Sequence, residues 1–153
     1  MSEYRITAEE LKEEHMASAS RYITKFQEYA EELPDNPIRT SLNETIRELR
    51  ELRDMQYWFD SGEKELAKLY DRYLPYLDEI LQKYIHLQTF IRFAEVRKLR
   101  DRLASSLQTM NDTIRNIRLI LPQDEIDDAS YTAKAKKAKA QLDAVTLPKE
   151  SGQ

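Results

Sequence analysis

Histidine is the first side chain to consider for catalysis or metal binding, and this 153-residue sequence contains only two, His15 and His86. Metal-binding helical bundles place a glutamate three residues before a histidine, but Lys12 and Lys83 stand at those positions here. The sequence also lacks a His-Glu-x-x-His motif, and a zinc site would need several nitrogen ligands together. We therefore interpret both residues as ordinary histidines at helix interfaces, and we expect no metal and no cofactor.

The other residue types that perform catalysis are scarce or uninformative. Cysteine is absent and glycine occurs only at Gly62 and Gly152, which excludes a thiolate nucleophile, a glycine-rich phosphate loop and a nucleophile elbow. Carboxylates are abundant, but an acid–base pair needs a buried environment that a sequence does not reveal. The acidic and basic residues of 44–54 instead suggest i,i+4 surface pairs. No catalytic residue is assigned, and the sequence favours a protein that is not an enzyme.

A basic segment is the first candidate binding site. Seven basic residues face three acidic ones between residues 92 and 118, although the whole chain has a net charge of −4. The segment 9–32 shows the reverse, with seven acidic and three basic residues. We favour neighbouring helices whose faces attract each other. The alternative is a patch for an anionic partner, either phosphate or a lipid head group, formed by Arg92, Arg97, Lys98, Arg100 and Arg102.

Tyrosines around a proline form the second candidate. Tyrosine buries a large apolar ring and keeps a polar tip, so helical spacing alone accounts for these residues as core and core-edge packing. The functional alternative is a groove for a peptide or small ligand at a helix kink, lined by Tyr70, Tyr73, Pro75, Tyr76 and Tyr84.

Four amphipathic segments would position these candidates. Apolar residues recur at spacings of three and four over 11–33, 38–55, 66–91 and 96–121, which is the pattern of helices with one buried stripe. A capping box at Thr7-Ala8-Glu9-Glu10 predicts the start of the first helix. Asn36 and Pro37 predict the start of the second as its N-cap and first residue.

Three junctions leave alternatives open. Gly62 either closes one helix while Asp60 or Ser61 caps the next, or marks a simple bend. Pro75 requires either a fresh helix start or a bent helix. The apolar stripe changes phase within 90–95, which indicates a turn, yet no glycine or proline marks it, and one continuous helix is the alternative.

These elements predict an all-α protein, an antiparallel bundle of three to four long amphipathic helices. The chain would form one domain over 1–145, followed by a disordered tail at 146–153. The alanine–lysine run 133–140 has almost no bulky apolar residue, so the C-terminal helix should pack weakly. No apolar run approaches the length of a membrane span.

One segment resembles a known family. Tyr73-Leu74-Pro75, followed by leucines and Tyr84, is similar to the signature of the bacterial XpaC-like family, the 5-bromo-4-chloroindolyl phosphate hydrolysis proteins. The resemblance spans about 38–145, while Arg72-Tyr73 departs from the fuller aromatic pair expected before Leu-Pro. It implies a link to phosphate-ester hydrolysis, but it carries no catalytic residues over to this chain. It supports an accessory, stress- or envelope-associated role better than catalysis.

We therefore expect a non-enzymatic interaction or scaffold protein of a bacterial cytoplasm, a location that the absence of cysteine fits. A protein partner or self-association through coiled-coil-like stripes is the expected contact. The acidic balance, with a pI near 5.4, argues against nucleic acid. Contact of Lys134–Lys139 with an anionic membrane is a less favoured alternative. The runner-up function is phosphate-ester hydrolysis, with the segment 92–118 binding the phosphate.

Overall fold

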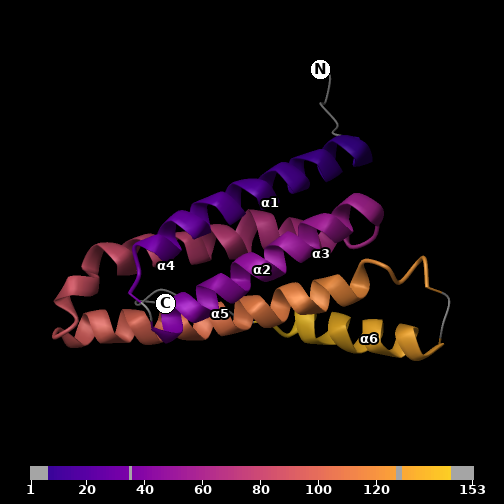
Figure 1. Cartoon of the computed structure of the whole chain (residues 1–153). Helices are drawn as coiled ribbons and strands as arrows, with labels where there is room; N and C mark the ends of the chain where they lie inside the picture. Colours follow the sequence, from indigo (N-terminus) through magenta and orange to yellow (C-terminus); the bar gives the residue numbers. More distant parts are fainter. Residues whose placement is uncertain (1–6, 35, 127–128, 146–153) are drawn as a thin grey trace, which may run out of the picture.

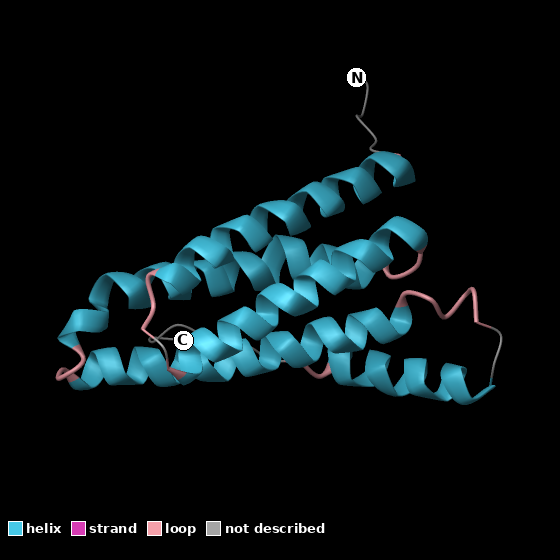
Figure 2. Cartoon of the chain, viewed as in Figure 1, coloured by secondary structure: helices cyan, strands magenta, loops and turns pink. Residues whose placement is uncertain are grey.

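The structure is a computed structural model that describes residues 7–34, 36–126 and 129–145, so the predicted tail lies outside the described residues. Every regular element within these ranges is helical, which confirms the all-α fold (Figure 2). The elements, in chain order, are α1 (Ala8–Glu31), α2 (Pro37–Trp58), α3 (Glu63–Lys68), η1 (Leu69–Tyr73), α4 (Leu74–Leu87), η2 (Gln88–Phe90), α5 (Ala94–Ile120) and α6 (Ala129–Asp143).

The first two helices begin where the sequence predicts. The Thr7 hydroxyl accepts a hydrogen bond from the Glu10 backbone N–H at 3.1 Å, and the Asn36 side chain accepts one from the Arg39 N–H at 3.1 Å. Each bond satisfies one of the donors that a helix leaves unpaired at its start. Pro37 follows Asn36 at the start of α2, where its missing N–H costs nothing.

The bundle consists of four antiparallel rods, which are α1, α2, the continuous segment α3–η1–α4, and α5 (Figure 1). α1 packs against α2 and α4, and α5 packs against the same two helices from the opposite side. α1 and α5 are therefore diagonal to each other, so the expected attraction between the acidic first helix and the basic segment 92–118 is wrong. The basic helix neighbours the acidic residues of α2 instead.

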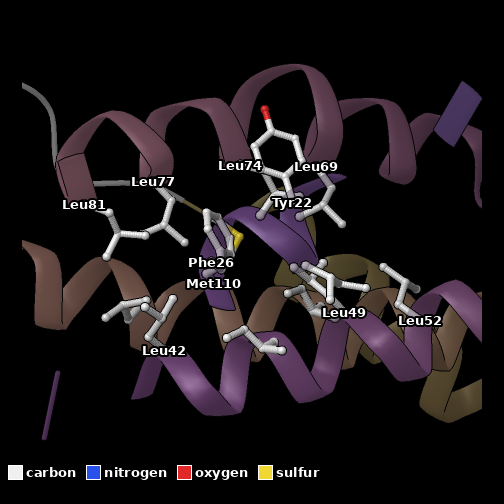
Figure 3. Close-up of a cluster of buried hydrophobic side chains, with 14 of the residues drawn as sticks. Tyr22, Phe26, Leu42, Leu49, Leu52, Leu69, Leu74, Leu77, Leu81 and Met110 are labelled. Carbon is white, nitrogen blue, oxygen red and sulfur yellow. The ribbon is translucent and has the colours of Figure 1, made fainter. Parts of the chain in front are cut away.

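The core is a continuous cluster of apolar side chains between the four rods. Phe26 of α1, Leu49 of α2, Leu77 of α4 and Met110 of α5 are fully or almost fully buried (Figure 3). Burying one such side chain contributes roughly 1.5–3 kcal/mol. The three- and four-residue spacing read from the sequence is the spacing of these core positions.

Pro75 is accommodated by a change of helix type. The π-helix η1 precedes it, and the Leu74 N–H donates to the carbonyl of Leu69, five residues back. α4 is assigned from Leu74, with Pro75 in its first turn, but Tyr73 and Leu74 keep helical backbone angles and the rod α3–η1–α4 is helical throughout. The chain therefore makes no fresh start at Pro75, and the alternative of one helix altered around the proline is the closer one.

Gly62 does not close α2 as the first of the two readings predicts, because the C-cap of α2 is Phe59, but it lies in the turn that joins α2 to α3. Its φ of 84° lies in the left-handed region that favours glycine, and it occupies the N-cap position of α3 itself. No side chain caps α3, so the proposed capping role of Asp60 or Ser61 is wrong. A Cβ at position 62 would also lie 2.7 Å from Leu121 Cδ2, so the residue that ends α5 packs directly on this glycine.

A turn separates α4 from α5, as the change of phase within 90–95 predicts. The 3₁₀-helix η2 ends at Phe90, residues 91–93 turn, and α5 begins at Ala94. Arg97 stabilises this turn, because its Nη1 donates to the backbone carbonyl of Ile91 at 3.1 Å and to that of Arg92 at 2.5 Å. The turn needs no glycine, because none of its residues has a positive φ and the arginine side chain satisfies two of its carbonyls.

The C-terminal helix α6 packs on α5, outside the four-rod bundle (Figure 1). Its buried residues are Ala135, Ala138 and Leu142, which confirms the expectation of sparse packing. In the described part of the chain, no helix is both long enough and apolar enough to cross a membrane.

Candidate functional sites

A cavity of about 430 Å³ opens at one end of the bundle, and we name this region the cavity end. It lies between the first turns of α1, the last turns of α2 and the start of α3. Leu11, Phe59 and Leu66 supply most of its apolar lining, and His15 and Gln56 add buried polar groups. Its volume is in the range of small-molecule sites.

Gln56 is the most unusual residue of this cavity. The side chain is 1% exposed, and its Oε1 accepts a hydrogen bond from the Tyr70 hydroxyl at 2.5 Å. Burial raises the pKa of Tyr70, so its hydroxyl stays protonated and remains a donor. The Gln56 Nε2 has no hydrogen-bond partner in the described structure. A buried amide donor without an acceptor costs about 1–3 kcal/mol.

His15 also lies in this cavity and is buried, with its ring centroid 5.4 Å from that of Tyr70. Burial lowers the pKa of His15 below its ordinary value of 6.5. The fields of nearby carboxylates oppose this effect, from Asp71, Glu14 and Glu63 in decreasing order, but do not overcome it. His15 is therefore neutral near pH 7 and buried, as expected of an interfacial histidine. His86 is exposed, so the expectation of an interfacial position is wrong for that residue.

The charged rim of the cavity is held by one tethered lysine. Lys12 Nζ lies 2.9 Å from Asp60 Oδ1 and donates to the carbonyl of Tyr57 at 3.0 Å, which ties α1 to the end of α2. Tyr57 and Trp58 stand beside this contact with their rings 5.0 Å apart and edge to face. Trp58 is 73% exposed, the highest exposure among the large hydrophobic residues that the structure describes.

The opposite end of the bundle carries a second exposed cluster, which we name the turn end (residues 88–98). Phe90 and Phe93 are 50% and 54% exposed, and Ile91 beside them is 38% exposed. The two phenylalanine rings contact each other with centroids 6.3 Å apart. This end of the molecule is the extremity where α4 meets α5 (Figure 1).

The structure divides the predicted basic patch into residues with different roles. Arg92 and Lys98 are exposed and make no ion pair with any described residue. Arg97 is committed to the turn carbonyls, and Arg100 pairs with Asp101 at 3.2 Å. Arg102 is half-buried. Two of the five predicted cations are therefore presented next to the exposed aromatic residues, and the other three bind within the fold or lie partly inside it.

The predicted tyrosine set separates in the same way. Tyr70 and Tyr84 are buried in the core, and Tyr73 and Tyr76 pack partly exposed against it. Pro75 is half-buried in the first turn of α4. These positions match the packing interpretation. Tyr70 has an additional role that the groove hypothesis did not anticipate, because it orients Gln56 in the cavity.

One surface pair of the kind that the sequence suggested occurs in α2, between Glu44 and Arg47 at 3.5 Å, but other acidic residues of α2 bind arginines on α5. Glu48 is buried and accepts hydrogen bonds from Arg115 Nε at 3.2 Å and Arg118 Nη1 at 2.6 Å, both on α5. Arg115 also pairs with Glu44, and Arg118 with Glu51 at 2.7 Å. The network joins α2 to α5, because the arginines that bind these glutamates lie on the neighbouring helix and not four residues away in α2. No group of three or more potential metal ligands occurs within the described ranges.

Two residues of the cavity end were missed by the sequence reasoning. Gln56 follows Leu49 and Leu52 on the buried stripe of α2, so a polar residue at an apolar position was the available signal. Trp58, which ends α2 and faces solvent, was not among the candidate residues. No protein-family model, curated protein or solved structure matches this chain, so the XpaC-like resemblance remains a hypothesis.

Proposed function

We propose that this chain is a non-enzymatic interaction protein and that its turn end binds a partner protein with an acidic, partly apolar surface. The observation that carries the proposal is the contact pair Phe90–Phe93, exposed beside Arg92 and Lys98. Aromatic residues and arginine are enriched where proteins bind each other, and they supply most of the energy at interface centres. We also expect the protein to act in a bacterial cytoplasm, which its lack of cysteine fits.

The charges around the turn end favour a protein over a flat anionic membrane. Gln88 Nε2 donates to the Glu32 backbone carbonyl at 3.0 Å, which brings the end of α1 against η2. The side chains of Glu31, Glu32 and Glu95 are exposed in this region. A lipid surface of uniform negative charge would repel them, whereas a protein surface can place opposite charges against each.

Site-specific photo-crosslinking tests this proposal directly. A photoreactive phenylalanine analogue at position 93 should crosslink one partner protein in cells, and the double variant Arg92→Glu/Lys98→Glu should abolish that product. The matched control is the same analogue at Leu119, an exposed apolar residue near the other end of α5. Equal crosslinking from both positions would contradict a specific surface. A product made only of this chain would identify self-association.

Two further outcomes would redirect the proposal. Salt-sensitive binding of the purified protein to anionic vesicles, lost in the same double variant, would identify a membrane partner instead. Hydrolysis of 5-bromo-4-chloroindolyl phosphate that survives further purification, but falls when Arg92 and Lys98 become alanine, would overturn the non-enzymatic assignment.

A further inference from the structure

The cavity end has features that the turn end does not share, and they point to a small ligand. Gln56 lines the cavity, and its amide Nε2 is buried without a hydrogen-bond partner among the described residues. Its carbonyl oxygen is already occupied by Tyr70, which directs the pairing of Gln56 with a ligand toward the nitrogen. A nitrogen of this kind pairs with an acceptor oxygen, such as a carbonyl or a hydroxyl.

The charge of the cavity selects the sign of such a ligand. Glu9 and Glu63 line the cavity and make no ion pair with any other described residue, while Asp60 is neutralised by Lys12. His15 adds no charge near pH 7, since burial lowers its pKa. The remaining charge of the lining is therefore negative, which attracts a cation and repels an anion.

The walls set the shape and polarity of the rest of the ligand. Leu11, Phe59 and Leu66 supply apolar surface to the cavity lining. A ligand in the cavity gains by burying apolar atoms against them, at about 25 cal/mol per Å² removed from water. A volume of about 430 Å³ accommodates a small molecule rather than a folded domain.

We propose that the cavity binds a small organic ammonium compound with a short apolar body and an oxygen acceptor. The oxygen accepts from Gln56 Nε2, the apolar body lies against Leu11 and Leu66, and the ammonium group faces Glu9 and Glu63. Amines that carry a neighbouring amide or hydroxyl group have this chemistry. The site is at the opposite end of the bundle from the turn end, so it does not depend on the proposed partner protein.

Three small molecules test the proposal on the full-length protein. Leucinamide has all three features, the ammonium group, the carbonyl and the branched apolar body. N-acetylleucinamide lacks the charge, and isopentylamine lacks the carbonyl. We expect leucinamide to shift the Gln56 side-chain amide signals saturably in NMR titrations. We expect the other two to bind at least about tenfold more weakly, because one loses the contact with the carboxylates and the other loses the hydrogen bond to Gln56.

Matched variants locate the binding site. Glu9→Gln/Glu63→Gln should weaken leucinamide at least about tenfold, since each removes a carboxylate from the rim. Glu13→Gln, an exposed change on α1 outside the cavity lining, should leave its affinity unchanged. Gln56→Met/Tyr70→Phe removes both hydrogen-bonding side chains and should abolish the preference for leucinamide over isopentylamine. Tyr70→Phe alone keeps the Gln56 amide and should retain that preference.

The result that overturns the proposal is equally clear. Absence of saturable shifts with leucinamide in the folded wild-type protein would mean that the cavity holds only solvent. Equal affinities for the three probes, or an unchanged affinity in Glu9→Gln/Glu63→Gln, would show that the binding does not use the acidic rim and Gln56. Circular dichroism melting of each variant separates a lost site from a lost fold. Arg92→Glu/Lys98→Glu should leave leucinamide binding intact, which separates this test from that of the turn end.

Discussion

The side-chain oxygens of Thr45 on α2 and Asn111 on α5 lie 2.5 Å apart, and both residues are buried between the two helices. Asn111 Nδ2 also donates to the Ser41 backbone carbonyl at 3.2 Å. Both hydrogen bonds cross between the helices, so they form at only one alignment of α2 against α5. We infer that this pair determines the register of the two helices, as buried polar residues do in some coiled coils.

The first prediction concerns that pair. Asn111→Leu should destabilise the protein by about 2 kcal/mol, because it removes the two buried hydrogen bonds that join Asn111 to Thr45 and to the Ser41 carbonyl. The Thr45 hydroxyl keeps its bond to the Ser41 carbonyl within α2, and the double variant with Thr45→Val should lose less than the sum of the two single variants. Urea denaturation of the two single variants and the double variant measures the coupling. Strictly additive losses would show that the two side chains do not act together.

The second prediction concerns acid stability. Asp78 on α4 accepts from Lys25 Nζ at 2.7 Å and from the Tyr29 hydroxyl at 2.6 Å, both on α1. Burial alone would raise the pKa of Asp78, but these hydrogen bonds outweigh it and lower the pKa below 3.8. Ionised Asp78 therefore stabilises the fold fully above its unfolded pKa, and that stability is lost as the pH falls from there through the folded pKa.

Asp78→Asn cannot titrate, so the variant should lose less stability than the wild type as the pH is lowered from about 5 to 2, the interval in which a carboxylate with a lowered pKa loses its contribution. It should also be the less stable protein at pH 7, because the ion pair with Lys25 is gone. Thermal melts at matched ionic strength measure both effects. Parallel pH profiles for the two proteins would exclude Asp78 as a source of the acid sensitivity.

The third prediction compares two glutamates that contact the same arginine. Glu48 and Glu51 both bind Arg118, but the Glu48 side chain is 9% exposed and that of Glu51 is 50% exposed. Glu48→Gln should cost about 1–3 kcal/mol, because it leaves two arginines without their shared, buried carboxylate. Glu51→Gln should cost less than about 1 kcal/mol, as for other exposed pairs. Chemical denaturation measures both losses. Equal stability of the two variants would contradict the larger contribution of the buried Glu48.

The fourth prediction concerns the hairpin at Gly62. Gly62→Ala should destabilise the protein by about 1–2 kcal/mol, because alanine is strained in the left-handed conformation. The added methyl group also meets Leu121 Cδ2, so the side chain of Leu121 has to move. Lys64→Ala, an exposed change two residues later in α3, should have an effect within about 0.5 kcal/mol. Similar losses for both would indicate general sensitivity of this loop rather than a demand for glycine.

Helix starts and core positions were predictable because they depend on local patterns. Thr7 and Asn36 cap helices with side chains that reach only three residues along the chain, and Phe26 or Leu77 belong to stripes with helical spacing. The turn between α4 and α5 was detectable through a change of phase, although Arg97 closes it without glycine.

Features that join distant segments were not predictable. The partners of Glu48 are 67 and 70 residues away, and the order of helices around the bundle decides which charges meet. The π-helix before Pro75 depends jointly on core packing, the restricted geometry of proline and the phase of the helix, so no single residue predicts it. The cavity end combines Gln56, His15 and Glu63 from three helices, each unremarkable within its own segment.

The π-helix has a consequence for how this protein tolerates insertions and deletions. A wide turn holds one residue more than an α-helical turn, and each residue of an α-helix rotates the chain by about 100°. Removing an exposed residue such as Asp71 would therefore rotate Leu66 away from the core relative to Leu77, unless the wide turn reverted to α-helical geometry. The segment 69–73 thus shifts the helical phase between α3, which lines the cavity end, and α4, which leads to the turn end.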